Sequence, residues 1–157
     1  MRIIPNENSW IGFATTIANI SAPKVAEITG AVDLTDAIIT ITASATGNTV
    51  PTPSLKSLFE RSVPGTAAAQ FTMDAYRDDE DDTVYETLPR NTKGYVLISR
   101  FGGTGPDNAP AVGENCEVWP VHVSSRSNSA MTSNTAETFT VTAAVPDEPD
   151  EDAVVSA

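Results

Sequence analysis

The stretch "FTMDAYRDDEDDTVYETLPR", residues 71–90, begins with alternating apolar and polar residues, continues into five consecutive acids and ends near a proline. Its first part places Phe71, Met73 and Ala75 on one face, because successive side chains of a strand point to opposite faces. Residues 83–89 predict one short helix, since acidic residues stabilise a helix N-terminus and the proline ends the helix. The stretch therefore predicts a half-buried strand, a charged loop and a short helix.

Similar alternation recurs along the chain and predicts strands with one buried and one polar face, as in antiparallel sheets. In contrast, "GYVLISRF" is apolar on both faces from Tyr95 to Ile98, which predicts a central strand or one whose second face is covered by a neighbouring element. The other expected buried sets are Ile39, Ile41 and Ala43; Trp119, Val121 and Val123; Phe139, Val141 and Ala143, with Thr138, Thr140 and Thr142 opposite; and Ile11, Phe13 and Ile17.

The predicted fold class is mainly β, in a single domain of residues 1–145. Eleven prolines and nine glycines among 157 residues favour short strands joined by turns over a helical bundle. The segment "PDEPDEDAVVSA", residues 146–157, has too little apolar surface to fold by itself and is predicted to be an acidic, disordered tail. Turn-forming residues predict loops at 46–54, 63–66, 102–113 and 124–135.

The net charge of −12 is concentrated in two places. Five acids lie in residues 78–82 and five in residues 147–152, out of 21 in the chain, and the remaining 11 face nine Lys and Arg residues. No basic patch is formed, which disfavours binding of nucleic acid through its phosphates. The internal group, called the acidic cluster below, consists of Asp78, Asp79, Glu80, Asp81 and Asp82.

A calcium site is one interpretation of the acidic cluster. Asp78, Glu80 and Asp82 have the spacing of positions 1, 3 and 5 of an EF-hand loop. However, Thr83 stands where that loop needs glycine, and Pro89 stands where it needs a bidentate glutamate. The EF-hand motif is therefore absent, and a looser divalent site remains an alternative to a solvated or partner-facing loop.

The chain lacks the residue types that catalysis needs. His122 and Cys116 are its only histidine and cysteine, and together they are too few for a zinc site. If both lie on one extended strand, their six-residue separation places them about 20 Å apart, too far for a nucleophile and its base. We expect a protein that is not an enzyme and has no cofactor.

Cysteine content and hydropathy bear on where the chain is made. One cysteine cannot form an internal disulfide framework, and the start "MRIIPNENSW" has no apolar stretch of signal-peptide length. No segment approaches the length of apolar residues that crosses a bilayer. We therefore expect a protein without membrane partners, made in a reducing cytoplasm.

The sequence resembles a known family over roughly residues 10–150. The most distinctive segments are PTPS-x-x-x-x-F at 51–59, Y-R-D-D at 76–79, L-P-R-x-T-x-G-Y at 88–95 and F-T-V-T-x-A-V at 139–145. In these segments, and in "SAPKVAEITGAVDLT" near the start, it is similar to the major tail protein of long-tailed (siphovirus) bacteriophages, of the type found in viruses of actinobacteria. That protein is the tail tube subunit.

The resemblance implies a tail-tube β-sandwich or partial barrel with one flanking helix and long loops that contact other subunits. It implies a virion protein, made in the host bacterial cytoplasm, whose hexameric rings stack into a tube that conducts the genome. The implied partners are other copies of the chain, the tape measure protein inside the tube, and the tail tip, initiator and terminator proteins. DNA would pass through the channel without specific binding.

The resemblance gives the acidic cluster a candidate role at the channel or at a ring interface. Duplex DNA carries about one negative charge per 1.7 Å of its axis, so a channel that lets it slide must avoid stripes of Lys and Arg. The threonine faces, such as Thr138, Thr140 and Thr142, are the alternative channel lining. The residues alone also allow a β-sandwich adhesion or binding module displayed on a particle surface.

Overall fold

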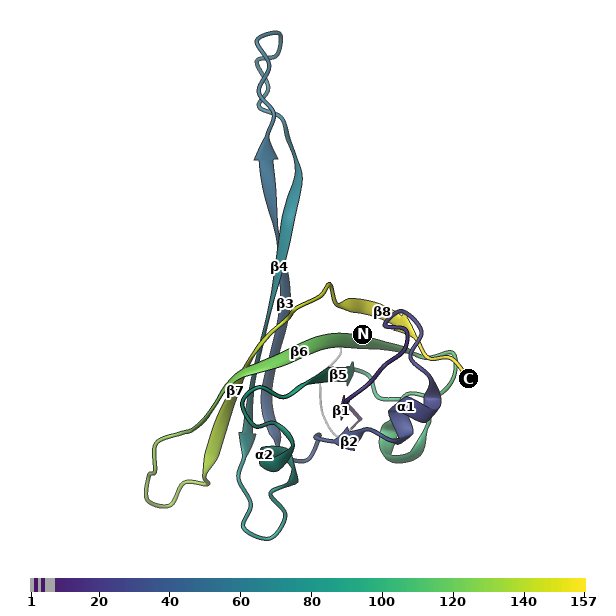
Figure 1. Ribbon diagram of the computed structural model, residues 1–157, viewed down its shortest axis with the longest axis vertical. Helices are drawn as coiled ribbons and strands as arrows, with labels where there is room; N and C mark the ends of the chain where they lie inside the picture. The colour runs from purple at the N-terminus through teal and green to yellow at the C-terminus, as the bar shows by residue number, and fades with distance from the viewer. Residues whose placement is uncertain (1, 3, 5–7) are drawn as a thin grey trace.

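A computed structural model describes residues 2, 4 and 8–157 of the chain. It forms an open antiparallel sheet of eight strands in the order β2-β1-β5-β6-β7-β4-β3, with β8 paired to β6 (Figure 1). The mainly β prediction is therefore confirmed. The elements are β1 (Trp10–Ala14), α1 (Val25–Thr29), β2 (Val32–Asp33), β3 (Ile38–Pro51), β4 (Ser62–Tyr76), α2 (Thr83–Thr87), β5 (Lys93–Ser99), η1 (Pro106–Asn108), β6 (Asn115–Asn128), β7 (Thr138–Ala144) and β8 (Asp150–Val154).

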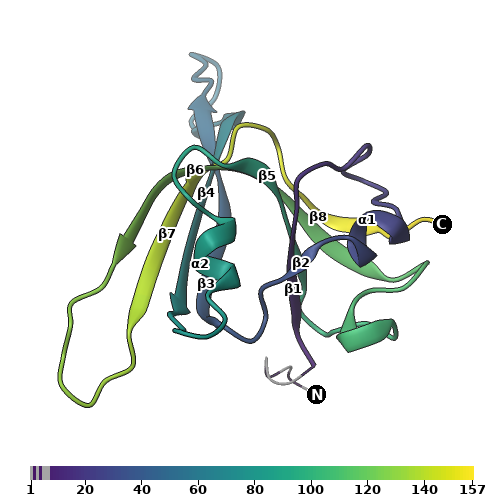
Figure 2. The same ribbon diagram turned by 60° about the horizontal axis from the view of Figure 1, so that its bottom comes forward.

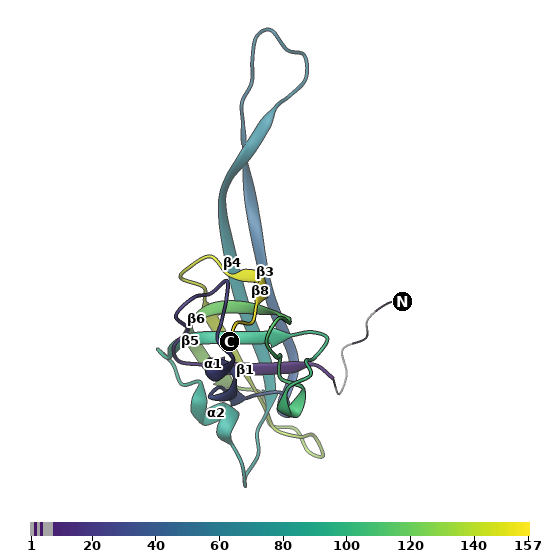
Figure 3. The same ribbon diagram turned by 90° about the vertical axis from the view of Figure 1, so that its right-hand side faces the viewer.

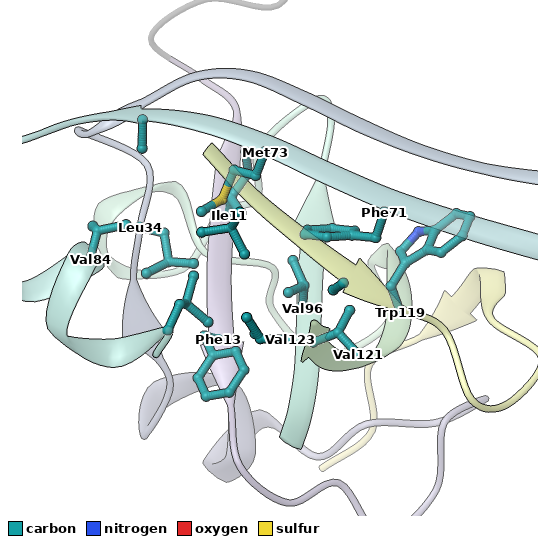
Figure 4. Packing of buried hydrophobic residues seen from close by; sticks show 14 of the residues in the cluster. Ile11, Phe13, Leu34, Phe71, Met73, Val84, Val96, Trp119, Val121 and Val123 are labelled. Carbon is teal, nitrogen blue, oxygen red and sulfur yellow. The ribbon is translucent and has the colours of Figure 1, made fainter. Parts of the chain in front are cut away.

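Two apolar clusters lie on opposite sides of β5 and β6. Alternate residues of β5 belong to different clusters, with Val96 and Ile98 in the larger and Leu97 in the smaller. This arrangement confirms β5 as a strand covered on both faces. Figure 4 shows the larger cluster, with Phe71 beside Trp119 at one side and Leu34 near Val84 at the other.

The predicted buried sets on β4, β6 and β7 are confirmed. On β3 the prediction of Ile39 is wrong, because a bulge between Ile38 and Thr40 turns Ile38 toward the core and leaves Ile39 exposed. Ile17 is buried as expected, but in the smaller cluster rather than with Ile11 and Phe13. It lies beyond the end of β1, so the strand alternation no longer sets its direction.

The most prominent feature is the β3–β4 hairpin, which projects far beyond the rest of the molecule (Figures 1 and 3). The two strands pair from Ile38 and Ala75 out to Pro51 and Ser62. The loops predicted at 46–54 and 63–66 are therefore largely wrong, since most of these residues belong to the strands. Glycine and proline residues occur in the part of the hairpin that extends beyond the core. There, backbone pairing rather than side-chain packing holds the two strands together.

Short helices cover the sheet. The helix expected at 83–89 is present as α2, Thr83–Thr87, with Val84 in the core. Figure 2 shows α2 between the β3 and β4 side of the sheet and the β1 and β2 side. The structure adds α1, which contributes Ile28 to the smaller cluster. Within the described residues no helix has the length and apolar character to span a membrane.

The C-terminal segment differs from the disordered tail that the sequence predicted. Residues Asp150–Val154 form β8 and pair with the first residues of β6. Ala153 and Val155 are buried in the smaller cluster, and the Ser156 amide donates to the Pro23 carbonyl. The prediction failed because the apolar residues of the segment are too few to form a core but enough to complete an existing one.

Replacing Val155 with alanine tests this packing, and the exposed neighbour Val154 provides the control. Val155 is 2% exposed and Val154 is 44% exposed. We expect Val155→Ala to lower the free energy of unfolding by about 2 kcal/mol, because two buried methyl groups are lost and a cavity remains. Val154→Ala should change it by less than about 0.5 kcal/mol in the same urea titration. Equal effects of the two substitutions would contradict the buried placement of this segment.

Candidate functional site

The acidic cluster forms the loop between β4 and α2, at the end of the molecule opposite the hairpin tip (Figures 1 and 3). Asp78, Asp79, Glu80 and Asp81 are exposed, whereas Asp82 is partly buried. Asp82 is held by Arg77, the residue that precedes the cluster: the guanidinium Nη2 lies 2.7 Å and Nε 2.8 Å from Asp82 Oδ2. The hydrogen bond to Asp82 raises the pKa of Arg77 above its usual value. One of the five acids is therefore neutralised inside its own loop.

Arg77 also belongs to a stack on Tyr85 that fastens α2 to the sheet. The guanidinium carbons of Arg77 and Arg126 lie 3.6 Å and 3.7 Å from the centre of the Tyr85 ring. Two such groups cannot share one face of a ring at these distances, so they cover opposite faces. Phe139 meets the ring edge-on at 5.1 Å, and Arg126 Nη1 donates to the Tyr85 carbonyl at 2.6 Å. Cation–π contacts of this kind stabilise the docked helix.

Local hydrogen bonds shape the rest of the acidic cluster. Asp78 Oδ1 accepts from the backbone amides of Glu80 and Asp81, and these bonds lower the pKa of Asp78. Asp81 accepts from the Thr83 hydroxyl at the start of α2. Among the residues that the structure describes, no group of three or more His, Cys, Asp or Glu side chains is arranged to hold a metal ion. The structure thus brings Asp78, Asp81 and Asp82 into the turn and leaves Asp79 and Glu80 outward.

Removing the charge of Asp82 should lower the melting temperature, whereas removing the charge of Glu80 should not. Asp82→Asn removes the charge paired with Arg77, which also contacts Tyr85 and Asn128, so we expect a lower melting temperature. Glu80→Gln removes the same charge from an exposed side chain and should leave the melting temperature unchanged. Thermal unfolding followed by circular dichroism compares them. A decrease of the same size in both would mean that total charge, rather than the Arg77 pair, sets the stability of the loop.

A second candidate surface is the polar face of strands β3, β4, β7 and β6. Cross-strand pairing aligns its residues in rows, such as Thr42, Thr72, Thr142 and Ser125. The opposite face of the same strands carries core residues such as Phe71 and Val141. This surface, called the hydroxyl face below, consists of Thr40, Thr42, Ser44, Gln70, Thr72, Asp74, Thr138, Thr140, Thr142, His122, Ser125 and Ser127.

The hydroxyl face is nearly free of charge. Asp74 is its one acid, and its carboxylate accepts a 2.6 Å hydrogen bond from Thr140. The set contains no lysine or arginine, although the exposed Lys93 of β5 pairs with His122 and adjoins the face at one edge. The nearby Arg126 pairs in register with Val141 and contacts Tyr85, which places it on the core side of the sheet. The sequence predicted the threonines of β7 as one such surface, and the strand register extends it over four strands.

The 102–113 loop is held by one carboxylate. Glu114 accepts hydrogen bonds from the backbone amides of Thr104 and Ala111 and from the Thr104 hydroxyl. These bonds, chiefly that from Ala111, lower the pKa of Glu114. Gly102 adopts a φ of 74°, and an added Cβ there would meet the Asn8 carbonyl oxygen at 1.8 Å. The loop predicted at 102–113 is thus held by defined contacts at Thr104, Ala111 and Gly102.

Acidification should open this loop. Because the folded pKa of Glu114 is lowered, its contribution is fully present above the usual glutamate pKa and is lost as the pH falls through the lowered value. We expect faster hydrogen exchange at the Thr104 and Ala111 amides of Glu114→Gln than of the wild type at neutral pH. The difference should shrink once the wild-type carboxylate is protonated. A difference that persists undiminished at low pH would show that the charge of Glu114 does not hold the loop.

The residues considered for nucleophilic chemistry do not form a reactive pair. Cys116 is buried in the smaller cluster, and burial raises the pKa of its thiol to about 11. His122 belongs to the hydroxyl face and pairs with Lys93 and Ala144 in the ladder. The buried carboxylate of Glu117 is paired with Arg100 and accepts from the Trp119 indole at 3.2 Å. These groups serve the packing of β6.

The comparisons with known proteins agree with this architecture. No curated protein matches the chain. A chain from the tail of an empty GTA particle, with C6 symmetry, superposes with a TM-score of 0.61 at 12% identity, over 96% of this chain and 100% of that one. A chain from the virion of a native gene transfer agent gives 0.59 at 12% identity, with the same coverage.

A further structure with this fold comes from the extended sheath–tube complex of PVC, an extracellular contractile injection system. It has a TM-score of 0.61 at 12% identity, over 97% of this chain and 93% of that one. At these identities the structures establish a shared fold. The family model described as phage tail tube protein matches residues 1–157. The chain therefore belongs to the phage tail tube protein family.

Proposed function

We propose that this chain is the repeating subunit of a tail tube, in which hexameric rings stack around a channel that conducts the genome during ejection. As a family member it is a structural protein of the virion tail. The C6 symmetry of the GTA tail, which contains a chain of the same fold, supports six copies in each ring. The family match favours this function over a displayed adhesion module.

The hydroxyl face is the surface that we assign to the lining of the channel. Its residues span four adjacent strands, and Asp74 is its single charged residue, already hydrogen bonded to Thr140. The hydroxyl face itself has no Lys or Arg to offer counter-charge to phosphates, and Lys93, which pairs with His122, adjoins it at one edge, so DNA moves past the face with little electrostatic adhesion. We therefore place the hydroxyl face toward the channel and the helix α2 on the outer side of the sheet.

The acidic cluster has a different place in this assembly. Its loop lies beyond the end of β4, opposite the hairpin tip, rather than within the hydroxyl face (Figure 1). A position at one end of the subunit faces a neighbouring ring when rings stack along the hairpin direction. Of the two sites considered from the sequence, we favour the ring interface over the channel for Asp78, Asp79, Glu80, Asp81 and Asp82.

The remaining partners follow from the same assembly. A hollow tube needs an occupant that keeps its channel filled before the genome enters, and two end structures that start and stop its growth. We propose the tape measure protein for the channel, and the tail tip or initiator and terminator proteins for the two ends. The tube itself needs no enzyme activity or cofactor.

Electron microscopy of the purified protein over a range of concentrations tests the proposal. Rings or hollow tubes with six subunits in each ring are the expected result, with light scattering to give the mass. Tube growth is also expected when purified tail tips are added to the monomer. A protein that stays monomeric under both conditions would contradict the proposal.

Lysines on the hydroxyl face should slow DNA. Thr42 and Thr142 are exposed, lie on this face and flank Thr72 in one row. We expect virions with Thr42→Lys and Thr142→Lys to release DNA several-fold more slowly than virions with Thr42→Gln and Thr142→Gln, which match the length without the charge. The difference should be largest at low salt. Equal release rates from tails of normal length would contradict the channel placement of this face.

A further inference from the structure

His122 is the residue of the hydroxyl face that can gain a positive charge near neutral pH. It is the only histidine of the chain, is half-buried and lies on β6 in the ladder with β7. Histidine is the side chain whose charge ordinarily changes between about pH 5 and pH 8. The face that the proposed tube turns toward DNA therefore carries one group whose charge depends on the pH.

Lys93 stands beside His122 on the neighbouring strand. The two residues are directly opposite in the β5–β6 ladder, so their side chains leave the same side of the sheet, with Cβ atoms about 5 Å apart. Alternation along β5 also gives Lys93 the direction of Leu97, in the smaller cluster, and not that of Val96, in the larger one. Lys93 is exposed. The edge of the hydroxyl face therefore pairs a permanent cation with one that appears on protonation.

The row of residues that contains this pair has no acid. Pairing continues from His122 to Ala144, Gln70 and Ser44 on the next three strands. The single acid of the face, Asp74, lies four residues beyond Gln70 along β4, about 13 Å away at about 3.3 Å per residue. This separation exceeds the Debye length of about 8 Å at physiological salt, so the charge of Asp74 is largely screened from the row.

The other titratable groups around the pair keep their charge over the same pH range. Asp147 and Glu148 follow shortly after the end of β7, and Asp150 of β8 pairs with Val118 in the first part of β6. On β5, Tyr95 shares the side of the sheet that Lys93 occupies. Carboxylates stay ionised and phenols stay neutral between about pH 5.5 and pH 8. The histidine is therefore the side chain of this subunit whose charge changes in that range.

We propose that His122 and Lys93 form a contact site for the phosphates of DNA in the channel, and that protonation of His122 strengthens this site. The inference rests on the proposed function, because it needs the hydroxyl face to line the channel. One pair in each subunit gives a circle of pairs in each ring, and protonation doubles the positive charge of the circle. Phosphates that exchange counterions for these cations are retained longer, so DNA release slows as the pH falls from about 8 to about 5.5.

Release of DNA from virions tests the site. The rate is measured for the wild type and for His122→Gln, which cannot take up a proton, at about pH 8 and about pH 5.5. Taking the ratio of wild type to variant at each pH removes effects of pH on the rest of the virion. We expect this ratio to fall at least threefold between the two pH values at low salt, and much less at high salt. A ratio that stays the same at both pH values would overturn the proposal.

A relocated histidine provides the matched control. His122→Gln with Ser133→His keeps one histidine in each subunit but moves it to the exposed loop between β6 and β7, beyond the hydroxyl face. This variant should release DNA as His122→Gln does at both pH values. His122→Lys fixes the positive charge and should release DNA more slowly than His122→Gln at both. Recovery of the pH dependence by Ser133→His, or equal rates for His122→Lys and His122→Gln, would overturn the site.

Purified tubes give a second measurement that does not depend on the virion. A short labelled DNA duplex should sediment with wild-type tubes at about pH 5.5 several-fold more than with His122→Gln tubes at the same pH. The excess should disappear at about pH 8. Equal amounts of DNA on the two kinds of tube at the lower pH would contradict a phosphate contact at His122.

The outcomes separate this site from the proposed function. If Thr42→Lys with Thr142→Lys slows DNA but the His122 ratio does not change with pH, the hydroxyl face lines the channel and the phosphate site is wrong. If neither change affects release from tails of normal length, the channel placement is wrong and the phosphate site is overturned with it. Absence of rings and tubes from the wild type, with tail tips also present, would overturn the proposed function itself.

Discussion

The pairing of β6 with three other strands is the interaction on which the rest of the structure depends. One edge of this strand pairs with β5, and the other pairs first with β8 and then with β7. Its first half is buried on both faces, so the two apolar clusters meet across it. Pairing with β7 starts at His122 and Val123 and continues to Asn128 beyond the bulge between Val123 and Ser125. Without this shared strand, the short helices and β8 would have no surface to cover.

The same sheet serves packing on one side and, in the proposed tube, the channel on the other. Alternation directs Phe71, Met73 and Ala75 inward and Thr72 and Asp74 outward. The polar side is continuous because β3, β4, β6 and β7 each place an apolar row on the core side and a polar row on the other side. Neutral hydroxyl groups suit a surface that must contact DNA without retaining it.

The two acidic segments of the chain lie in different surroundings. Asp82 is partly buried and is compensated by Arg77 within the β4–α2 loop. The acids of 147–152 instead line a groove near the base of the β3–β4 hairpin.

The sequence by itself determined the β class, the strands with one buried face, the doubly buried β5 and the helix after the acidic cluster. These features are local, because alternation and helix signals act over a few residues. Only the tertiary structure decided that β8 pairs with β6, that residues 46–51 and 62–66 extend a hairpin, and that Arg77 and Arg126 enclose Tyr85. The β8–β6 pairing and the Arg126–Tyr85 contact depend on partners far away in the chain. A segment such as "DEDAVV" becomes a strand only when a ready edge and a nearly complete core accept it.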